Sequence, residues 1–483
     1  MGRLNLSELL EDVAAVPQGT DGVVRGITYR SFEVRPGDVF FCIRGFAADG
    51  HEFAADAVAR GAVAVVAERA LLGLDVPVVL VDDTRAALAL ASARFFGNPS
   101  ESLRVAGITG TNGKTTTTFL LDSILRAAGS ATGIVGTIET RIAGVAEHAS
   151  RTTPESRDLQ ALLRRMVDAG VEAVSMEVSS HAIDLHRVDG VTFSVAAFTN
   201  LSQDHLDYHT TMEEYFSVKS RLLKAVTPER RVVNVDDEHG RRLAGTLEVA
   251  WTVGTASDAA VRAEGVVLAP GACTFTLIAP SAEAKVHLPL AGAFNVSNAL
   301  VAAGCALAMG VPFETVVAGL SGAPQVPGRL ERIDAGQDFT VLVDYAHTPD
   351  GLESALHAVR GVTAGRVITV FGCGGDRDPD KRPLMGQIAG RLSDVAILTS
   401  DNPRSEDPVG IILQVQDGLD GTTAERIIEV DRHTAIAQAI GFARTGDTVL
   451  IAGKGHEDYQ IFADRTIHFD DREVAREELA KRW

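Results

Sequence analysis

A glycine-rich segment that carries one lysine and several hydroxyl groups is the strongest chemical signal in this sequence. It spans Gly107-Ile-Thr-Gly-Thr-Asn-Gly-Lys-Thr-Thr116, after a predicted apolar strand and at the start of a predicted helix over 115–128. Backbone N–H groups in such a turn bind phosphate oxygens. Lys114 would reach the β- and γ-phosphates and Thr115 would bind Mg²⁺. The general phosphate-loop pattern has glycine where this chain has Ile108, so the prediction depends on strand, loop and helix occurring in that order.

Two side chains suited to metal binding follow other predicted strands. Glu177 lies at the end of a predicted strand over 173–178, and His205 lies beyond one over 195–199. The carboxyl ends of parallel strands meet at one edge of a sheet, so we expect both side chains to face the nucleotide crevice. A metal held by carboxylate and imidazole would offset the repulsion between the nucleotide phosphates and a second anionic group. Alone, Glu177 is also compatible with a solvated strand-end acid, and His205 with a core or capping histidine.

Lysine is rare in this chain, which has 7 lysines and 38 arginines. Lys219 lies on a predicted helix over 212–225. An unmodified ammonium there would repel a second Mg²⁺. The ordinary alternative is a lysine whose stem lies along the helix while its charge reaches water.

A third group of polar residues follows strands in the C-terminal part of the chain. Asp344 comes directly after an apolar strand, where loops of open α/β sheets bind ligands. Arg404 and Arg377 follow two further strands, and a planar guanidinium can bind a carboxylate through two hydrogen bonds. Glu457, after the last strand, would pair with an ammonium, and Gly453 would allow close backbone approach. A surface turn with solvated arginines is the alternative.

The elements that position these residues alternate between strand and helix. The length of 483 residues suggests about three domains, and we place them at 1–98, 99–326 and 327–483. The predicted fold class is α/β: an N-terminal α/β domain, a central phosphate-loop domain with a mainly parallel sheet, and a C-terminal Rossmann-like α/β domain. We expect hinges at 97–100 and 324–328.

Composition excludes several classes of protein. The formal charge of −19 argues against nucleic acid as a partner. No uninterrupted apolar stretch of about 18 residues is present, so we expect no membrane span. The four cysteines are far apart and the N-terminus has no apolar signal region, which favours a reducing cytoplasm.

The phosphate-loop segment and six further motifs resemble the Mur ligases, ATP-dependent ligases that join an acid to an amino acid in peptidoglycan precursor synthesis. The further motifs are Met176-Glu-Val-Ser-Ser-His181, Thr199-Asn-Leu-Ser-Gln-Asp-His-Leu-Asp207, Tyr215-Phe-Ser-Val-Lys219, Gly292-Ala-Phe-Asn-Val-Ser-Asn298, Gly328-Arg-Leu-Glu331 and Asp344-Tyr-Ala-His-Thr-Pro349. The resemblance covers nearly the whole chain.

Within that family, three more segments resemble the members that add the third residue of the stem peptide. These are Thr152-Thr-Pro-Glu-Ser156, Asp401-Asn-Pro-Arg404 and Gly453-Lys-Gly-His-Glu457. The resemblance implies a cytoplasmic ligase, expected to be a monomer, that joins UDP-N-acetylmuramoyl-L-alanyl-D-glutamate to meso-diaminopimelate. ATP would phosphorylate the substrate carboxylate, with two Mg²⁺ ions present.

The resemblance also implies roles for individual residues. Lys114, Glu177, His205 and Lys219 would be catalytic, with Lys219 carbamylated to an anion. Metal ligands would be Thr115, Glu177, His205 and the carbamylated Lys219. ATP would contact Gly110, Thr111, Asn112, Gly113, Lys114, Thr115, Thr116, Asn295, Asn298, Arg329, Asp344 and His347. The UDP substrate would contact Ser31, Thr152, Thr153, Ser179 and Arg187, and diaminopimelate would contact Arg377, Asp401, Asn402, Pro403, Arg404, Gly453 and Glu457.

The chain departs from the family pattern at two places that bear on the UDP substrate. Arg30 and Phe32 stand where the uridine-binding segment of relatives has aspartate and arginine, and Leu185 stands where some relatives have glutamine. Three alternatives remain at this stage. The added amino acid is L-lysine or LL-diaminopimelate, the protein is a folylpolyglutamate- or cyanophycin-type ligase, or it binds nucleotide without catalysis.

Overall fold

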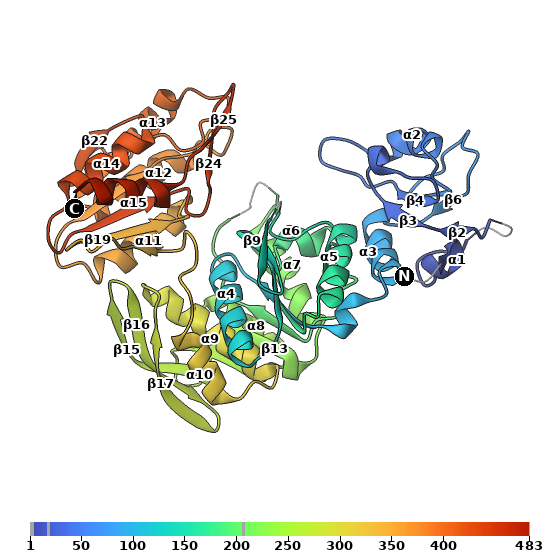
Figure 1. The fold of residues 1–483 in the computed structure, drawn as a ribbon, viewed down its shortest axis with the longest axis horizontal. Helices are drawn as coiled ribbons and strands as arrows, with labels where there is room; N and C mark the ends of the chain where they lie inside the picture. The colour runs from blue at the N-terminus through green and yellow to red at the C-terminus, as the bar shows by residue number, and fades with distance from the viewer. Residues whose placement is uncertain (1–3, 17–19, 150, 205–207, 483) are drawn as a thin grey trace.

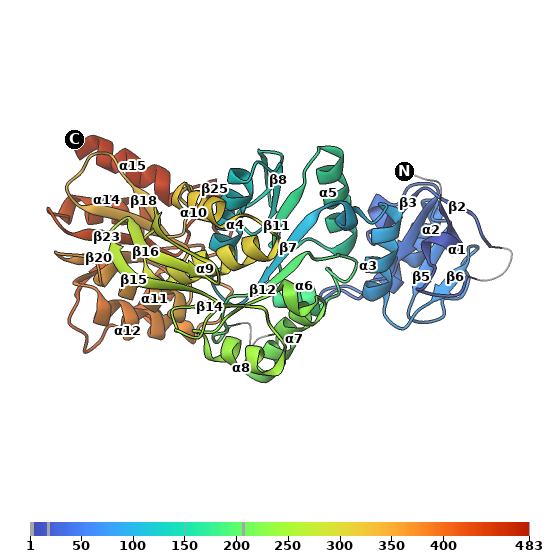
Figure 2. The same cartoon turned by 90° about the horizontal axis from the view of Figure 1, so that it is seen from below.

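The computed structural model describes residues 4–16, 20–149, 151–204 and 208–482. Three α/β units follow one another along the long axis of the molecule, from the N-terminal unit in blue to the C-terminal unit in orange and red (Figure 1). The view from below shows the same row, with the central unit between the other two (Figure 2). The predicted α/β class is therefore confirmed.

The first unit has a four-stranded parallel sheet in the order β3-β4-β5-β6. Val39, Phe41 and Val66 lie on one face of this sheet, where helix α3 covers them. The Asp83 carboxylate caps α3 by accepting from the N–H groups of Arg85 and Ala86. The elements are β1 (Leu4–Asn5), α1 (Leu6–Leu9), β2 (Val23–Val24), β3 (Gly26–Thr28), β4 (Asp38–Phe41), α2 (Ala54–Ala59), β5 (Ala64–Ala67), β6 (Val78–Leu80) and α3 (Thr84–Phe95).

The central unit has an eleven-stranded sheet in the order β10-β9-β8-β11-β7-β12-β13-β14-β15-β16-β17. Pairs from β8 to β15 are parallel, and those at both ends are antiparallel. The elements are β7 (Arg104–Thr109), α4 (Lys114–Ala127), β8 (Thr132–Val135), β9 (Glu139–Ile142), β10 (Val145–His148), α5 (Ser156–Asp168), β11 (Ala173–Glu177), α6 (Ser180–Asp184), β12 (Val195–Phe198), α7 (Met212–Lys224), β13 (Arg231–Asn234), α8 (Glu238–Thr246), β14 (Trp251–Gly254), β15 (Val261–Ala269), β16 (Ala272–Ala279), β17 (Ala282–Leu288), α9 (Ala293–Ala308) and α10 (Phe313–Ser321).

Both faces of the parallel core are buried, as its continuous apolar runs require. Along β7, Ala106 and Ile108 pack with α4, α9 and α10 on one face. Val105 lies on the other face, with α5 and α7. The phosphate loop follows the last residue of β7 and therefore lies at the carboxyl edge of this sheet.

The third unit has a six-stranded sheet in the order β18-β19-β23-β20-β21-β22, parallel except for β18. Apolar residues cover both of its faces. The elements are β18 (Glu331–Ile333), β19 (Thr340–Asp344), α11 (Pro349–Arg360), β20 (Val367–Phe371), α12 (Lys381–Leu392), β21 (Val395–Leu398), α13 (Pro408–Asp417), β22 (Glu425–Ile428), α14 (Arg432–Phe442), β23 (Thr448–Ala452), β24 (Tyr459–Ile461), β25 (Thr466–His468) and α15 (Asp471–Arg482).

No helix in the described part of the chain is long and apolar enough to span a membrane. All four cysteines are buried with free thiols. The domain limits at 98/99 and 326/327 remain a proposal.

Candidate active site

The phosphate loop joins β7 to α4 through a turn that needs glycine at two positions. Gly110 and Gly113 have φ angles of 150° and 85°. A Cβ on Gly110 would lie 1.8 Å from Thr199 Oγ1, and one on Gly113 would lie 2.2 Å from Asn298 Oδ1. The loop therefore comes into close contact with its neighbours on both sides.

Lys114 is the first residue of α4, and its ammonium folds back over the loop. Nζ donates to the carbonyl of Gly110 at 2.9 Å and to that of Thr111 at 2.8 Å. Burial lowers the pKa of Lys114, while the negative charge of Glu177 acts in the opposite direction. The ammonium is thus held at the N-terminus of α4. An anion bound there would also meet the positive end of the helix dipole.

A second loop holds the phosphate loop in place. The Asn112 N–H donates to Asn200 Oδ1 at 2.9 Å, and the Thr111 N–H donates to the Asn200 carbonyl at 2.9 Å. Ser202 exchanges hydrogen bonds with Thr111. The motif at 199–207 contained this signal, but sequence analysis assigned only His205 within it. His205 itself lies outside the described residues.

Glu177 ends β11 beside the phosphate loop. Its carboxylate accepts from Thr115 Oγ1 at 3.0 Å and from Thr137, through both N–H (2.8 Å) and Oγ1 (3.0 Å). Among the described residues no group of three His, Cys, Asp or Glu side chains surrounds a metal position. The Thr115 hydroxyl and the Glu177 carboxylate nevertheless fit Mg²⁺, a hard ion that takes few protein ligands alongside substrate phosphates and water.

Lys219 reaches the same loop from α7. The side chain is buried, Nζ donates to the Gly110 carbonyl at 2.8 Å, and it lies 4.5 Å from the centre of the Tyr215 ring. Burial, followed by the charge of Lys114, holds the pKa of Lys219 well below its usual range. Carbamylation of Lys219 remains a proposal.

A cavity of about 670 Å³ lies between the central and third units and brings many of the predicted residues together. It is large enough for a nucleotide. Its lining includes Thr111, Asn112, Gly113, Lys114, Thr115, Thr116, Thr152, Glu177, Ser179, Asn298, Arg329, Asp344 and His347. Asn200, Asn234 and Asp237 also line it and were missed by sequence analysis.

Arg329 crosses from the third unit to the phosphate loop. Its Nη2 lies 3.4 Å from Thr115 Oγ1, and its guanidinium stacks 4.8 Å above the Tyr345 ring. Asp344 accepts from the N–H groups of Leu330 (2.7 Å) and Ala346 (2.9 Å), so its oxygens hold the loop that carries His347. Burial raises the pKa of Asp344.

Asn295 is buried and does not line the cavity. Its amide donates to the Ala291 carbonyl at 2.7 Å, and its Oδ1 accepts from Asn298 Nδ2 at 3.0 Å. Asn298 is the residue that meets the loop at Gly113. Asn295 therefore holds Asn298 in position.

The predicted amino-acid site forms at the carboxyl edge of the third sheet around a buried lysine. Lys454 Nζ donates to Asn402 Oδ1 and to Glu457 Oε2, both at 3.1 Å, and lies 3.7 Å from Asp401. Asn402 also donates to Glu457 at 2.9 Å. Sequence analysis named Glu457 and Asn402 but missed Lys454, although lysine is rare in this chain.

The two predicted arginines lie on loops that touch. Arg404 has a φ of 52°, and its Nη1 donates to the Gly375 carbonyl at 2.7 Å. A Cβ on Gly375 would lie 1.9 Å from the carbonyl oxygen of Pro403, so glycine is needed for this contact. Arg377 is exposed and donates to the Asp376 carbonyl. Gly453, with a φ of 119°, lies against Asp401.

The residues predicted for the UDP substrate fall into two places. Thr153 Oγ1 donates to the Glu177 carbonyl at 2.8 Å, and Thr152 pairs with Thr137 at 3.0 Å. Ser179 caps α6. Arg187 donates to the Thr153 carbonyl at 3.2 Å, and all four of these residues belong to the central unit.

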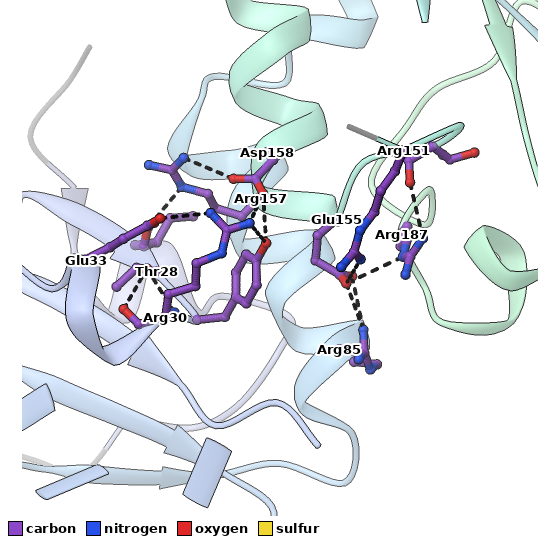
Figure 3. A network of polar contacts seen from close by, with 12 residues as sticks. Thr28, Arg30, Glu33, Arg85, Arg151, Glu155, Arg157, Asp158 and Arg187 are labelled. Atoms are coloured by element: carbon purple, nitrogen blue, oxygen red, sulfur yellow. Dashed lines mark hydrogen bonds and ion pairs between the residues drawn. The ribbon is translucent and has the colours of Figure 1, made fainter. Parts of the chain in front are cut away.

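Ser31 lies in the first unit, on a short 3-10 helix over Ser31–Glu33. The neighbouring Arg30 turns toward the central unit, where its Nη2 lies 3.2 Å from Asp158 on α5 (Figure 3). Phe32 is 71% exposed. The replacements at 30 and 32 therefore put an ion pair at the junction and an aromatic ring on the surface.

Comparisons with known proteins agree along the whole chain. Models of the Mur ligase family, catalytic domain, of the Mur ligase middle domain and of the Mur ligase, glutamate ligase domain match residues 23–96, 108–306 and 328–455. The UDP-N-acetylmuramoyl-L-alanyl-D-glutamate--2,6-diaminopimelate ligase of Bacillus licheniformis is 47% identical, covering 98% of this chain and 99% of the relative. That of Geobacillus kaustophilus is 49% identical and covers 94% of each.

Solved structures share the fold. A structure of a UDP-N-acetylmuramoyl-L-alanyl-D-glutamate--2,6-diaminopimelate ligase superposes with a TM-score of 0.74 at 30% identity, covering 100% of this chain and 99% of the other. The Mycobacterium tuberculosis folylpolyglutamate synthase complexed with ADP has a TM-score of 0.61 at 20% identity and covers 77% of this chain and 92% of the other, a likeness of fold alone. With family models matching all three units and relatives near half identical over almost the full length, this chain belongs to the Mur ligase family.

Proposed function

We propose that this chain is an ATP-dependent ligase that joins 2,6-diaminopimelate to the D-glutamyl γ-carboxylate of UDP-N-acetylmuramoyl-L-alanyl-D-glutamate, in peptidoglycan precursor synthesis. The observation that carries the proposal is the shared cavity. The phosphate loop, Glu177 and Thr152 meet there with Arg329 and His347 of the third unit. The names of the relatives at 47% and 49% identity support the choice of substrates.

The chemistry begins with phosphoryl transfer from ATP to the γ-carboxylate. The loop N–H groups and Lys114 hold the β- and γ-phosphates, and Arg329 closes on them from the third unit. Thr115, Glu177 and, in the proposal, His205 and a carbamylated Lys219 would hold Mg²⁺. The metal would reduce the repulsion between the two reacting anions. A carboxylate oxygen bonds to the γ-phosphorus, the bond to ADP breaks, and an acyl phosphate results.

The second step is attack by the amine of the amino acid. It adds to the acyl carbon, and the tetrahedral intermediate releases phosphate with the carboxylate oxygen attached. We place the distal end of the amino acid beside Arg404, Asn402, Asp401 and Glu457, with Arg377 available to a second carboxylate. The distal ammonium and carboxylate of diaminopimelate match this mixed acidic and basic set. The meso form is our proposed substrate.

Product analysis tests the assignment. The purified protein is incubated with ATP, Mg²⁺, the UDP-muramoyl dipeptide and, separately, meso-diaminopimelate, LL-diaminopimelate or L-lysine, and product masses are recorded. We expect a tripeptide product with meso-diaminopimelate, and Arg404→Ala should raise KM for it while KM for ATP stays the same. Efficient use of L-lysine, or no effect of Arg404→Ala, would refute the amino-acid assignment.

A further inference from the structure

A buried carboxylate lies where the first unit meets the central unit. Glu155 is 5% exposed, and three arginines converge on it (Figure 3). Arg85 Nη1 lies 3.1 Å from both carboxylate oxygens. Arg187 Nε and Arg151 Nη1 lie 3.4 and 4.0 Å from Oε2. Arg85 belongs to α3, which packs on the first sheet, so Glu155 connects the two units.

The Glu155 side chain is not used to build its own helix. Glu155 occupies the N-cap position of α5, but the side chain makes no capping hydrogen bond. Helices prefer serine, threonine, aspartate or asparagine at this position. The carboxylate points to the arginines instead, which indicates a role other than starting the helix.

The Glu155 carboxylate lies beside the Arg187 guanidinium and compensates part of its positive charge. Burial and the neighbouring arginines lower the pKa of Arg187, and Glu155 opposes them. Nη1 donates to the Thr153 carbonyl, whereas Nε has no acceptor at hydrogen-bond geometry among the described residues. Three guanidinium groups against one carboxylate leave an excess of positive charge next to Thr152 and Thr153.

We propose that Glu155 is a positioning residue for the UDP-linked dipeptide: it fixes the Arg187 guanidinium beside Thr153 and ties it, through Arg85, to the first unit. This inference rests on the proposed function and on the expectation from the sequence that Arg187 contacts the UDP substrate. We expect the first unit to hold the uridine part of the substrate. When this unit docks on the central unit, Arg85 and Glu155 orient Arg187 for contact with the peptide part.

The same junction offers a matched control. Asp158, three residues along from Glu155, accepts from Tyr29 Oη at 2.8 Å and pairs with Arg30 at 3.2 Å. This pair also connects the first unit to α5 (Figure 3), and no hydrogen bond or ion pair among the described residues joins Asp158 to Arg187. A substitution there changes the junction and leaves the dipeptide arginine in place.

The test is steady-state kinetics of the full chain with each of the three substrates varied in turn. Glu155→Gln should raise KM for the UDP-muramoyl dipeptide about tenfold or more, as expected when a charge-assisted contact is lost. KM for ATP and for diaminopimelate should stay within about twofold. Arg85→Met should raise the same KM, and the double variant should show no more than the larger single effect, because both act through one carboxylate. Asp158→Asn should leave it within about twofold.

Two results would overturn the inference while leaving the proposed function intact. One is an unchanged KM for the dipeptide substrate in Glu155→Gln. The other is an equal rise in Glu155→Gln and Asp158→Asn, which would make Glu155 a docking contact only. If Glu155→Gln is too unstable to assay, Arg85→Met against Asp158→Asn decides by the same comparison. A wild-type protein that forms no product from the UDP dipeptide and diaminopimelate refutes the proposed function itself.

Discussion

At the scale of single residues, one buried lysine in the third unit holds together two residues of the proposed amino-acid site. Lys454 is 0% exposed and donates to both Asn402 and Glu457. Asp401 and Glu457 alone would make this end of the site doubly negative and would favour a distal ammonium without a carboxylate. Lys454 lowers that negative charge, which suits an amino acid whose distal end is a zwitterion.

We therefore expect Lys454→Met to raise KM for diaminopimelate about tenfold, since it removes charged hydrogen bonds, and to leave KM for ATP within about twofold. In a Glu457→Gln background the same change should have a smaller effect, because Lys454 acts through Glu457. Steady-state kinetics of the two single variants and the double variant measure this. Fully additive effects would show that the two residues act independently.

His456 is held uncharged next to the same site. Burial, followed by the charges of Arg329 and Arg472, lowers its pKa from 6.5 to about 3, and its Nδ1 has no hydrogen-bond partner among the described residues. Between these two values the unfolded chain binds a proton that the folded chain does not. The free energy of unfolding should therefore fall as pH decreases from 6.5 toward 3.

The free energy of unfolding should fall by at most roughly 1.4 kcal/mol per pH unit between the two pKa values of His456. Urea unfolding of wild type and His456→Gln at several pH values measures it, with the difference between the two proteins isolating His456 from other groups. The wild type should lose stability faster than the variant on acidification. Parallel curves would mean that His456 titrates normally in the folded protein.

Sequence analysis found the residues that chemistry or a motif marks, and it missed those that only packing reveals. Lys114 and Glu177 were predicted because their positions follow strands, and the structure places both at the cavity. Asn295 was predicted to touch ATP, but it supports Asn298 from behind. Which of two nearby asparagines faces a cavity depends on helix rotation, which spacing alone does not fix. Glu155 and Lys454 lie in quoted motifs, but their partners Arg85 and Asn402 are distant in sequence.

At the scale of elements, the buried parallel strands were predictable and the antiparallel ones were not. The middle of β7 (105–108) and most of β23 (449–452) are apolar because both faces of these strands are covered. Strands β15, β16 and β17, over Val261–Leu288, were not predicted. β16 alternates between buried and half-buried residues, whereas β15 is largely exposed in its second half. These strands form a hairpin sheet edge that carries no motif, so chemistry offered no reason to look there.

The phosphate loop gives a prediction at this scale, because Gly113 combines a left-handed φ with close contact to α9. Gly113→Ala should cost about 1–2 kcal/mol for the backbone conformation and more for the displacement of Asn298. It should also raise KM for ATP. Thermal unfolding and ATP-dependent phosphate release measure the two effects.

Gly129→Ala is the control, because Gly129 has a φ of 81° at the other end of α4 with nothing within 4 Å of an added Cβ. It should lose similar backbone stability and keep a normal KM for ATP. If both variants keep a normal KM for ATP, the contact between Gly113 and Asn298 does not shape the nucleotide site.

At the scale of the whole molecule, the cavity proposed to hold the nucleotide is divided between two units. Thr115 and Arg329 lie on different units and approach to 3.4 Å. Gly328, with a φ of 64°, lies so close to His456 that a Cβ on Gly328 would be 2.1 Å from the backbone nitrogen of His456. The predicted hinge at 324–328 is thus tightly packed against the loop that follows β23.

We expect the central and third units to move closer to each other when the cavity fills, because residues of both units line it. Small-angle scattering should show a smaller radius of gyration with a non-hydrolysable ATP analogue and the UDP dipeptide together than with either alone. An unchanged curve would indicate that the protein already has its reactive arrangement without ligands.

The most direct test of the central claim follows an oxygen atom from substrate to phosphate. The D-glutamyl γ-carboxylate of the UDP dipeptide is labelled with oxygen-18, and the phosphate released with ATP and diaminopimelate is analysed by mass. The acyl phosphate mechanism predicts one labelled oxygen in each phosphate, because the attacking carboxylate oxygen stays on phosphorus when the amine displaces it. Lys114→Ala should release almost no phosphate. Tripeptide formation with unlabelled phosphate would contradict the mechanism.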